Sequence, residues 1–182
     1  MPQKTRLNNK DIVLISLSVT LIIICSWISI PLMVPFTMQT FAVFTIIGLL
    51  GTKRSTIAIL IYILIGAIGI PVFSEFTGGL GRLLGSTGGY IIGFIFTALI
   101  SGFIIDKLGK SSIAMIFSMI IGLLTCYLFG TAWFIYIYTN TTDPIGIMTA
   151  LSWCVFPFII PDLLKISLAV LIVKRVSKYI QV

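Results

Sequence analysis

Long apolar runs separated by short basic turns are the feature that most constrains this chain. Six runs are visible, over residues 12–30, 38–50, 55–70, 89–105, 113–138 and 145–173. Only 9% of the 182 residues are charged, whereas soluble domains carry about 25% charged residues. So few polar side chains cannot cover a water-soluble globule, and a membrane helix needs about 20 apolar residues. The sequence therefore predicts an all-α membrane protein, with six transmembrane helices in one domain over residues 1–182.

Two interruptions are expected between the runs. Pro31 and Pro35 cannot continue the first helix, so residues 31–37 form a short loop. The run 38–50 is shorter than the ~30 Å hydrocarbon core requires. We therefore expect this loop to reach membrane depth, where protein must bury it. Residues 72–88 contain five glycines and are expected to form the longest non-helical stretch, an outer loop that closes over a site as a lid.

The basic residues orient the predicted helices. An N-terminus in the cytoplasm places ten of the twelve basic residues inside, as the positive-inside rule requires. Both termini are then cytoplasmic, Arg82 lies in an outer loop, and Lys165 lies within a span. The ten inner residues are Lys4, Arg6, Lys10, Lys53, Arg54, Lys107, Lys110, Lys174, Arg175 and Lys178.

The chain carries little catalytic chemistry. It has no histidine, its five acidic residues are scattered, and its three cysteines lack CxxC spacing. Gly109-Lys110-Ser111 resembles the end of a phosphate-binding loop, but Ile104 stands where that motif needs glycine. We expect no enzymatic activity, no metal site and no cofactor. Because the basic residues lie between apolar runs, we also expect no nucleic-acid partner.

Lys165 is the strongest candidate for a functional residue. It precedes Lys174 by nine residues, about 14 Å of helix, which places it near the middle of the bilayer. A lysine at that depth is costly unless it faces a cavity or a partner. The alternative is a structural ion pair with Asp162, three residues earlier. Asp162 follows Pro161, so it either caps a new helix or belongs to a site at a break in the helix.

Other residues allow two interpretations each. Arg82 in the glycine-rich loop binds an anion or is a solvated loop charge. Ser16 and Thr20 form a small-residue face on the first helix, which packs internally or against a second membrane protein. Two glycine pairs, Gly66 with Gly69 and Gly89 with Gly93, are expected to allow close helix packing.

Several motifs occur together and in order. They are Val34-Pro35-Phe36-Thr37-Met38-Gln39-Thr40, Gly66-Ala67-Ile68-Gly69-Ile70-Pro71-Val72-Phe73, Gly78-Gly79-Leu80-Gly81, Gly85-Ser86-Thr87-Gly88-Gly89-Tyr90-Ile91-Ile92-Gly93-Phe94, Gly130-Thr131-Ala132-Trp133 and Pro161-Asp162-Leu163-Leu164-Lys165. In this combination the chain resembles the BioY family, the biotin-specific substrate-binding (S) components of energy-coupling-factor transporters. It departs at Ser86, where the family commonly has proline, and at Ser16 and Thr20, where alanines are often found.

The resemblance implies a protein of the plasma membrane that captures biotin with high affinity from outside. It would couple to a shared energy-coupling transmembrane protein and two cytoplasmic ABC ATPases, with Ser16 and Thr20 on the coupling face. A self-sufficient secondary carrier for a small anionic vitamin or metabolite is the alternative function, and Asp162 is then its one candidate for binding a coupling ion.

The chemistry of biotin assigns roles to the candidate residues. Its carboxylate needs a cation, its ureido ring needs hydrogen-bonding groups, and its apolar parts need walls. We expect Lys165 to bind the carboxylate, with Arg82 as the alternative cation. The ureido ring would use Asp162, Gln39, Tyr90 and Thr37, and the walls would include Phe36 and Phe73, with Trp27 and Trp133 as further candidates.

Overall fold

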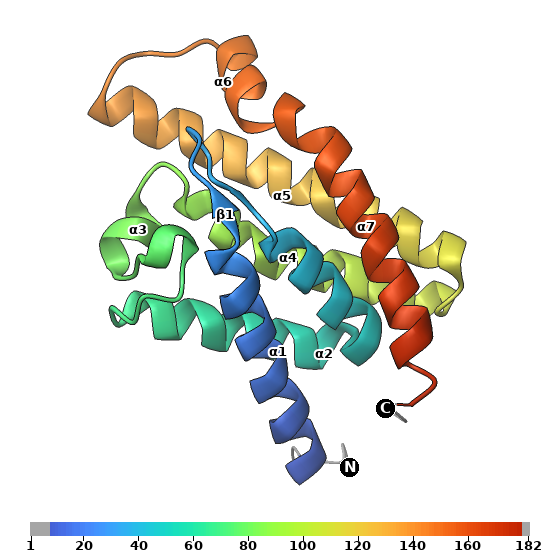
Figure 1. Ribbon diagram of the computed structural model, residues 1–182. Coiled ribbons are helices and arrows are strands. Elements are labelled where there is room, and N and C mark those ends of the chain that lie inside the picture. Colours follow the sequence, from blue (N-terminus) through green and yellow to red (C-terminus); the bar gives the residue numbers. More distant parts are fainter. Residues whose placement is uncertain (1–7, 180–182) are drawn as a thin grey trace, which may run out of the picture.

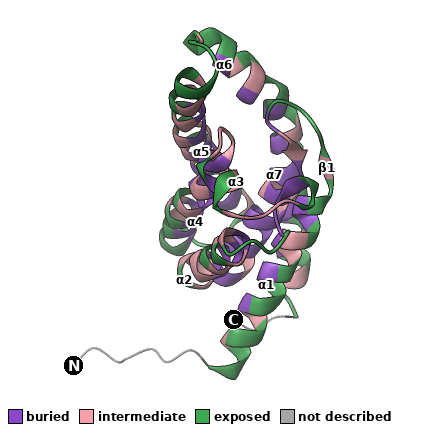
Figure 2. Ribbon diagram, turned by 90° about the vertical axis from the view of Figure 1, so that its left-hand side faces the viewer, coloured by how far each residue is buried: buried purple, intermediate pink, exposed green. Residues whose placement is uncertain are grey.

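The computed structural model describes residues 8–179, which form a helical bundle with one small hairpin (Figure 1). Lys4 and Arg6, used in the orientation argument, lie outside the described residues. Buried residues face the interior of the bundle and exposed residues cover its outer surface (Figure 2). Five described helical segments are long and apolar enough to cross a membrane. They are Asn9–Trp27, Gln39–Ala67, Gly88–Leu108, Ser112–Thr141 and the combined segment Ile147–Val176.

The predicted second and third helices form one bent element, α2 (Gln39–Ala67), which follows α1 (Asn9–Trp27). The bend lies at Gly51, whose φ of 74° and ψ of −176° are accessible mainly to glycine. The arms on either side cover residues 39–50 and 52–67. The Thr52 hydroxyl donates to the Asp106 carboxylate, so the bend is attached to the end of α4 (Gly88–Leu108).

The predicted proline loop after α1 is a β-hairpin. Strand β1 (Ser29–Ile30) pairs antiparallel with β2 (Phe36–Thr37), with Ser29 opposite Thr37. The tip is exposed at Leu32 and Met33, whereas Val34 and Thr37 are buried. The hairpin therefore turns one side toward the bundle, where its backbone is covered by protein.

The glycine-rich segment 72–88 is not entirely non-helical, so this expectation was wrong in part. It contains a 3₁₀ turn, η1 (Ser74–Phe76), and a short helix, α3 (Leu80–Leu84). The segment is held on α1, because Ser26 donates to the Val72 carbonyl (2.5 Å) and the Trp27 indole to the Pro71 carbonyl (3.0 Å). Packing of apolar side chains such as Leu83 against the bundle gives a short helix a buried face despite the glycines.

The last apolar run divides into two helices at Val155. After α5 (Ser112–Thr141), helix α6 (Ile147–Cys154) is separated by this one residue from α7 (Phe156–Val176). Pro157 occupies the first turn of α7, where a missing N–H costs nothing. Pro161 lies inside α7 and does not begin a helix. Asp162 is therefore not a capping residue.

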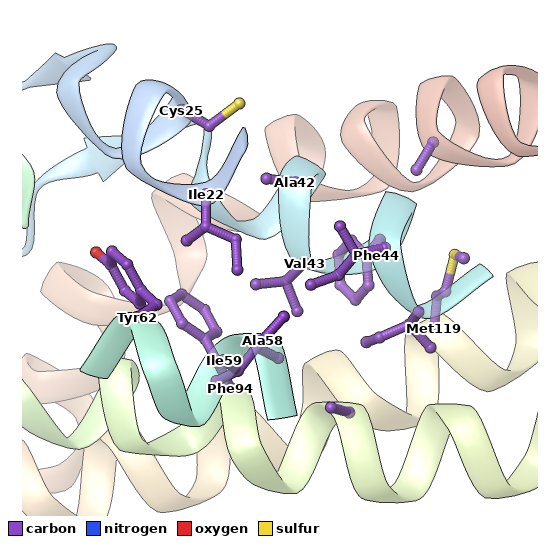
Figure 3. Packing of buried hydrophobic residues seen from close by; sticks show 14 of the residues in the cluster. Ile22, Cys25, Ala42, Val43, Phe44, Ala58, Ile59, Tyr62, Phe94 and Met119 are labelled. Carbon is purple, nitrogen blue, oxygen red and sulfur yellow. The ribbon is translucent and has the colours of Figure 1, made fainter. Parts of the chain in front are cut away.

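The core lies between α1, both arms of α2, α4, α5 and α7. Figure 3 shows Ile22, Val43 and Ile59 pointing toward one another from α1 and α2. Glycines bring α4 against α5, because a Cβ at Gly89 would overlap the Cβ of Trp133. The expectation for Gly69 was wrong: a Cβ there would meet no atom within 4 Å, and its φ of 103° makes it a turn glycine.

Replacing Gly89 by alanine should separate α4 from α5 and destabilise the bundle. Overpacking of this kind lowers the free energy of unfolding by about 1–3 kcal/mol, because the Trp133 Cβ cannot rotate out of the way. We expect the melting temperature in detergent to fall by several degrees. Gly81→Ala is the matched control, since no atom lies within 4 Å of the position that its Cβ would take in α3. Equal melting temperatures for both variants would contradict this packing role.

Candidate ligand-binding site

A buried ion pair on α7 is the centre of the candidate site. Lys165 Nζ lies 2.8 Å from Asp162 Oδ1, and the two side chains are 6% and 2% exposed. They are three residues apart in an apolar helix, so they share one face. Two charges removed from water in this way require close hydrogen-bonding partners.

The Lys165 ammonium has acceptors for all three of its protons. Besides Asp162, it donates to the Thr37 carbonyl at 2.7 Å and to Thr40 Oγ1 at 3.1 Å. It also lies 4.1 Å from the centroid of the Phe36 ring, a cation–π contact. An ammonium offers three donors, so this lysine is saturated before any ligand is present.

Asp162 is held by two hydroxyl groups that the sequence did not single out. Thr40 donates to Oδ1 at 2.9 Å, and the Tyr127 hydroxyl donates to Oδ2 at 2.6 Å. The residues come from α2, α5 and α7, so three helices converge on one carboxylate. A single hydroxyl within an apolar run has no pattern that distinguishes it.

A second group of polar side chains, Thr37, Gln39 and Tyr62, joins the hairpin to both arms of α2. The Thr37 hydroxyl donates to Gln39 Oε1 at 2.9 Å, and Gln39 Nε2 donates to the Tyr62 hydroxyl at 2.6 Å. Tyr62 packs edge-on against Phe73, with ring centroids 5.4 Å apart. Phe73 is therefore a core residue beneath the polar group and does not line the cavity.

The ion pair and this second polar group border a cavity of about 480 Å³, a volume that includes open solvent. Five residues predicted from the sequence line it: Lys165, Asp162, Tyr90, Gln39 and Thr37. Further lining residues were not predicted, namely Val34, Pro35, Thr40, Phe94, Leu123, Cys126, Tyr127, Cys154 and Phe158. Most of the unpredicted residues are apolar, so the cavity combines one charged end with apolar walls.

A neighbouring space of about 300 Å³ shares Thr37, Gln39 and Tyr90 with the first and extends to Ser74 and Thr87. Because they share these residues, the two spaces adjoin one another. Among the described residues, no group of three or more Cys, Asp and Glu side chains is placed to hold a metal ion.

Arg82 lies beside this extension without lining it. Its guanidinium donates to Ser74 Oγ at 3.1 Å and lies 3.5 Å from Glu75 Oε2. Its Nε is buried and has no hydrogen-bond partner. The interpretation of Arg82 as a fully solvated charge was therefore wrong.

The remaining predicted residues lie elsewhere. Trp27 and Trp133 donate to carbonyls of the glycine-rich segment and its neighbours, Pro71 and Gly85. Ser16 and Thr20 are exposed on α1, and their hydroxyls donate to backbone carbonyls of the same helix. The small-residue face is therefore not packed inside this chain.

Known proteins match this chain over nearly its whole length. The sequence model of one family, the BioY family, matches residues 1–182. The biotin transporter BioY of Thermotoga maritima is 41% identical over 160 residues, which is 87% of this chain and 90% of that protein. The biotin transporter BioY of Rhodobacter capsulatus is 30% identical over 181 residues, 93% and 94% of the two chains.

A solved structure shares the fold. The crystal structure of the S-component for biotin from an ECF-type ABC transporter superposes with a TM-score of 0.82 at 28% identity. The match covers 96% of this chain and 95% of the other.

Removing the carboxylate of Asp162 should destabilise the fold strongly. Asp162→Asn leaves the Lys165 ammonium buried without its anion, and breaking such a pair costs about 3–5 kcal/mol. Asp162→Asn combined with Lys165→Met should recover most of that loss, because no charge then remains. Denaturant unfolding in detergent measures both effects. Glu75→Gln, at the more exposed ion pair with Arg82, is the control. A double variant no more stable than Asp162→Asn would contradict this account.

Proposed function

The chain belongs to the BioY family, and from that premise we propose that it captures biotin and imports it as the S subunit of an energy-coupling-factor transporter. The observation that carries this function is the match to biotin transporters along nearly the whole chain, together with a cavity that has a charged pair at membrane depth. The protein is a multi-pass protein of the plasma membrane and is not an enzyme.

We propose that the two arms of α2 cross the membrane separately, which gives six spans in a single domain. Contacts between turns support this topology with cytoplasmic termini. Arg54 pairs with Asp11 at 2.8 Å, and Lys110 donates to the Leu49 carbonyl, so three inner turns meet at one end. The hairpin and the segment 72–88 then lie on the outer side. The partners would be a shared energy-coupling transmembrane protein and two cytoplasmic ABC ATPases.

A self-sufficient secondary carrier finds less support. That function needs a carboxylate at depth to bind a coupling ion. Asp162 was the one candidate, and both of its oxygens already accept hydrogen bonds, from Lys165, Thr40 and Tyr127.

We propose that Lys165 binds the biotin carboxylate by exchanging one of its partners. The contact with Thr40 Oγ1, at 3.1 Å, is the longest of its three hydrogen bonds. An ionised carboxylate is a better acceptor than a hydroxyl, so it can take this position. The ureido ring would use Asp162, Gln39, Tyr90 and Thr37, and the Phe36 ring would border the ligand.

A second arrangement is favoured by the buried, unpartnered Nε of Arg82. In this arrangement Arg82 binds the carboxylate in the extension near Ser74, and the Lys165–Asp162 pair binds the ureido ring. The two adjoining spaces would accommodate either orientation. In both, the segment 72–88 covers the outer end of the site as a lid.

Lys165→Ala should weaken binding of biotin by tenfold to a hundredfold, because a charge-assisted hydrogen bond contributes about 1.5–3 kcal/mol. Binding of the neutral biotin amide should change far less, since that ligand carries no charge. Titration calorimetry of both ligands against the wild type, Lys165→Ala and Arg82→Ala gives two parallel cycles. If only Arg82→Ala distinguished the acid from the amide, the carboxylate would lie at Arg82.

Ser16→Phe should abolish biotin uptake by the whole transporter while leaving biotin binding by the isolated chain intact. Ser16 is exposed on α1, and small residues there permit close approach of a partner helix. Leu128→Phe, at a residue 74% exposed on α5, is the matched control and should leave both uptake and binding unchanged. Simultaneous loss of uptake and binding in Ser16→Phe would contradict a coupling role.

A further inference from the structure

The last two turns of α7 carry a face that the transport mechanism does not use. Leu171, Lys174 and Arg175 lie along one side of α7 at the spacing i, i+3, i+4, and Lys178 follows in the turn after the helix ends at Val176. Together with Ser177 they line a surface groove. Three cations therefore share one groove with an exposed leucine.

No carboxylate of the described residues neutralises this face. The ion pairs within residues 8–179 join Arg54 to Asp11, Arg82 to Glu75 and Lys165 to Asp162, and none includes a cation of the groove. Cations at the end of a helix interact well with its dipole, and the positive-inside rule favours them here. Neither effect requires the cations to line a groove beside an apolar side chain.

We propose that this groove binds the headgroup of an anionic phospholipid of the inner leaflet. The Arg175 guanidinium offers a planar pair of donors to phosphate oxygens, and Lys174 and Lys178 add two ammonium groups. Leu171 is 66% exposed and lies one turn further into the apolar span, where it contacts the acyl chain. The inference rests on the membrane orientation given above.

A membrane lipid fits this face better than a soluble acidic partner. The side chain of Leu171 lies on the hydrocarbon side of the cations, where lipid tails reach and a water-soluble protein surface does not. Clustered lysine and arginine at the cytoplasmic end of a span attract anionic lipids in this way. One amphipathic molecule therefore binds both parts of the face, with its headgroup at the cations and its acyl chain at the leucine.

The test compares two double variants that each remove two positive charges from the same side of the membrane. In Lys174→Gln/Lys178→Gln, the affinity for phosphatidylglycerol, titrated by native mass spectrometry, should fall about tenfold or more relative to the wild type. In the control, Lys107→Gln/Lys110→Gln, it should change less than about twofold. Biotin binding in phosphatidylcholine nanodiscs should be equal for all three proteins.

Several outcomes would overturn the proposal. Equal loss in both double variants would show general attraction of anionic lipid to a basic surface. No loss in either would show that the groove does not bind lipid. Displacement of phosphatidylglycerol by millimolar inorganic phosphate would show a site for soluble phosphate.

The lipid site and the transport function fail separately. A chain that retains lipid selectively at the groove but does not bind biotin would count against the transport function alone.

Discussion

The burial of one ammonium and one carboxylate inside an apolar segment long enough to cross a membrane is the constraint on which the rest of the site depends. Lys165 and Asp162 are almost completely removed from solvent and must find their hydrogen-bonding partners within the protein. Thr40 on α2 and Tyr127 on α5 supply hydroxyls to the carboxylate, and the Thr37 carbonyl accepts from the ammonium. Three helices and the hairpin therefore have to meet at one point, which is the charged end of the cavity.

The same pair makes the irregular backbone of the hairpin tolerable. A backbone carbonyl in an apolar environment is costly unless a donor satisfies it, and a strand of two residues leaves few backbone donors nearby. Thr37 is the last residue of β2, two residues before α2 begins, and Lys165 donates to its carbonyl at 2.7 Å. The short apolar run 38–50 suffices as the beginning of α2 because protein covers the loop before it. The lysine thus stabilises the break between α1 and α2, which contributes Val34, Pro35 and Thr37 to the lining of the cavity.

Hydropathy and charge identify part of this arrangement but not all of it. Lys165 and Asp162 stand out in the sequence because charges are rare in an apolar run. Thr40 and Tyr127 do not, since each is one hydroxyl in a long helix and acts only through a carboxylate 122 and 35 residues away. The sequence alone does not say which proline begins α7, because Pro157 and Pro161 both satisfy the rule for a first-turn proline. Packing of Phe158 in the core selects the earlier one.

The two candidate cations differ in what a ligand must do to reach them. All three protons of Lys165 are already engaged, so a ligand would bind there only by exchange, with a gain equal to the difference between two acceptors. Arg82 has a buried Nε proton without an acceptor, so a ligand that reached it would bind by addition and relieve an existing cost. Exchange at Lys165 would reject neutral ligands more strongly, because an amide oxygen is hardly better than the hydroxyl it replaces. A site that must choose an ionised vitamin over its neutral derivatives therefore gains selectivity from a lysine that is saturated in advance.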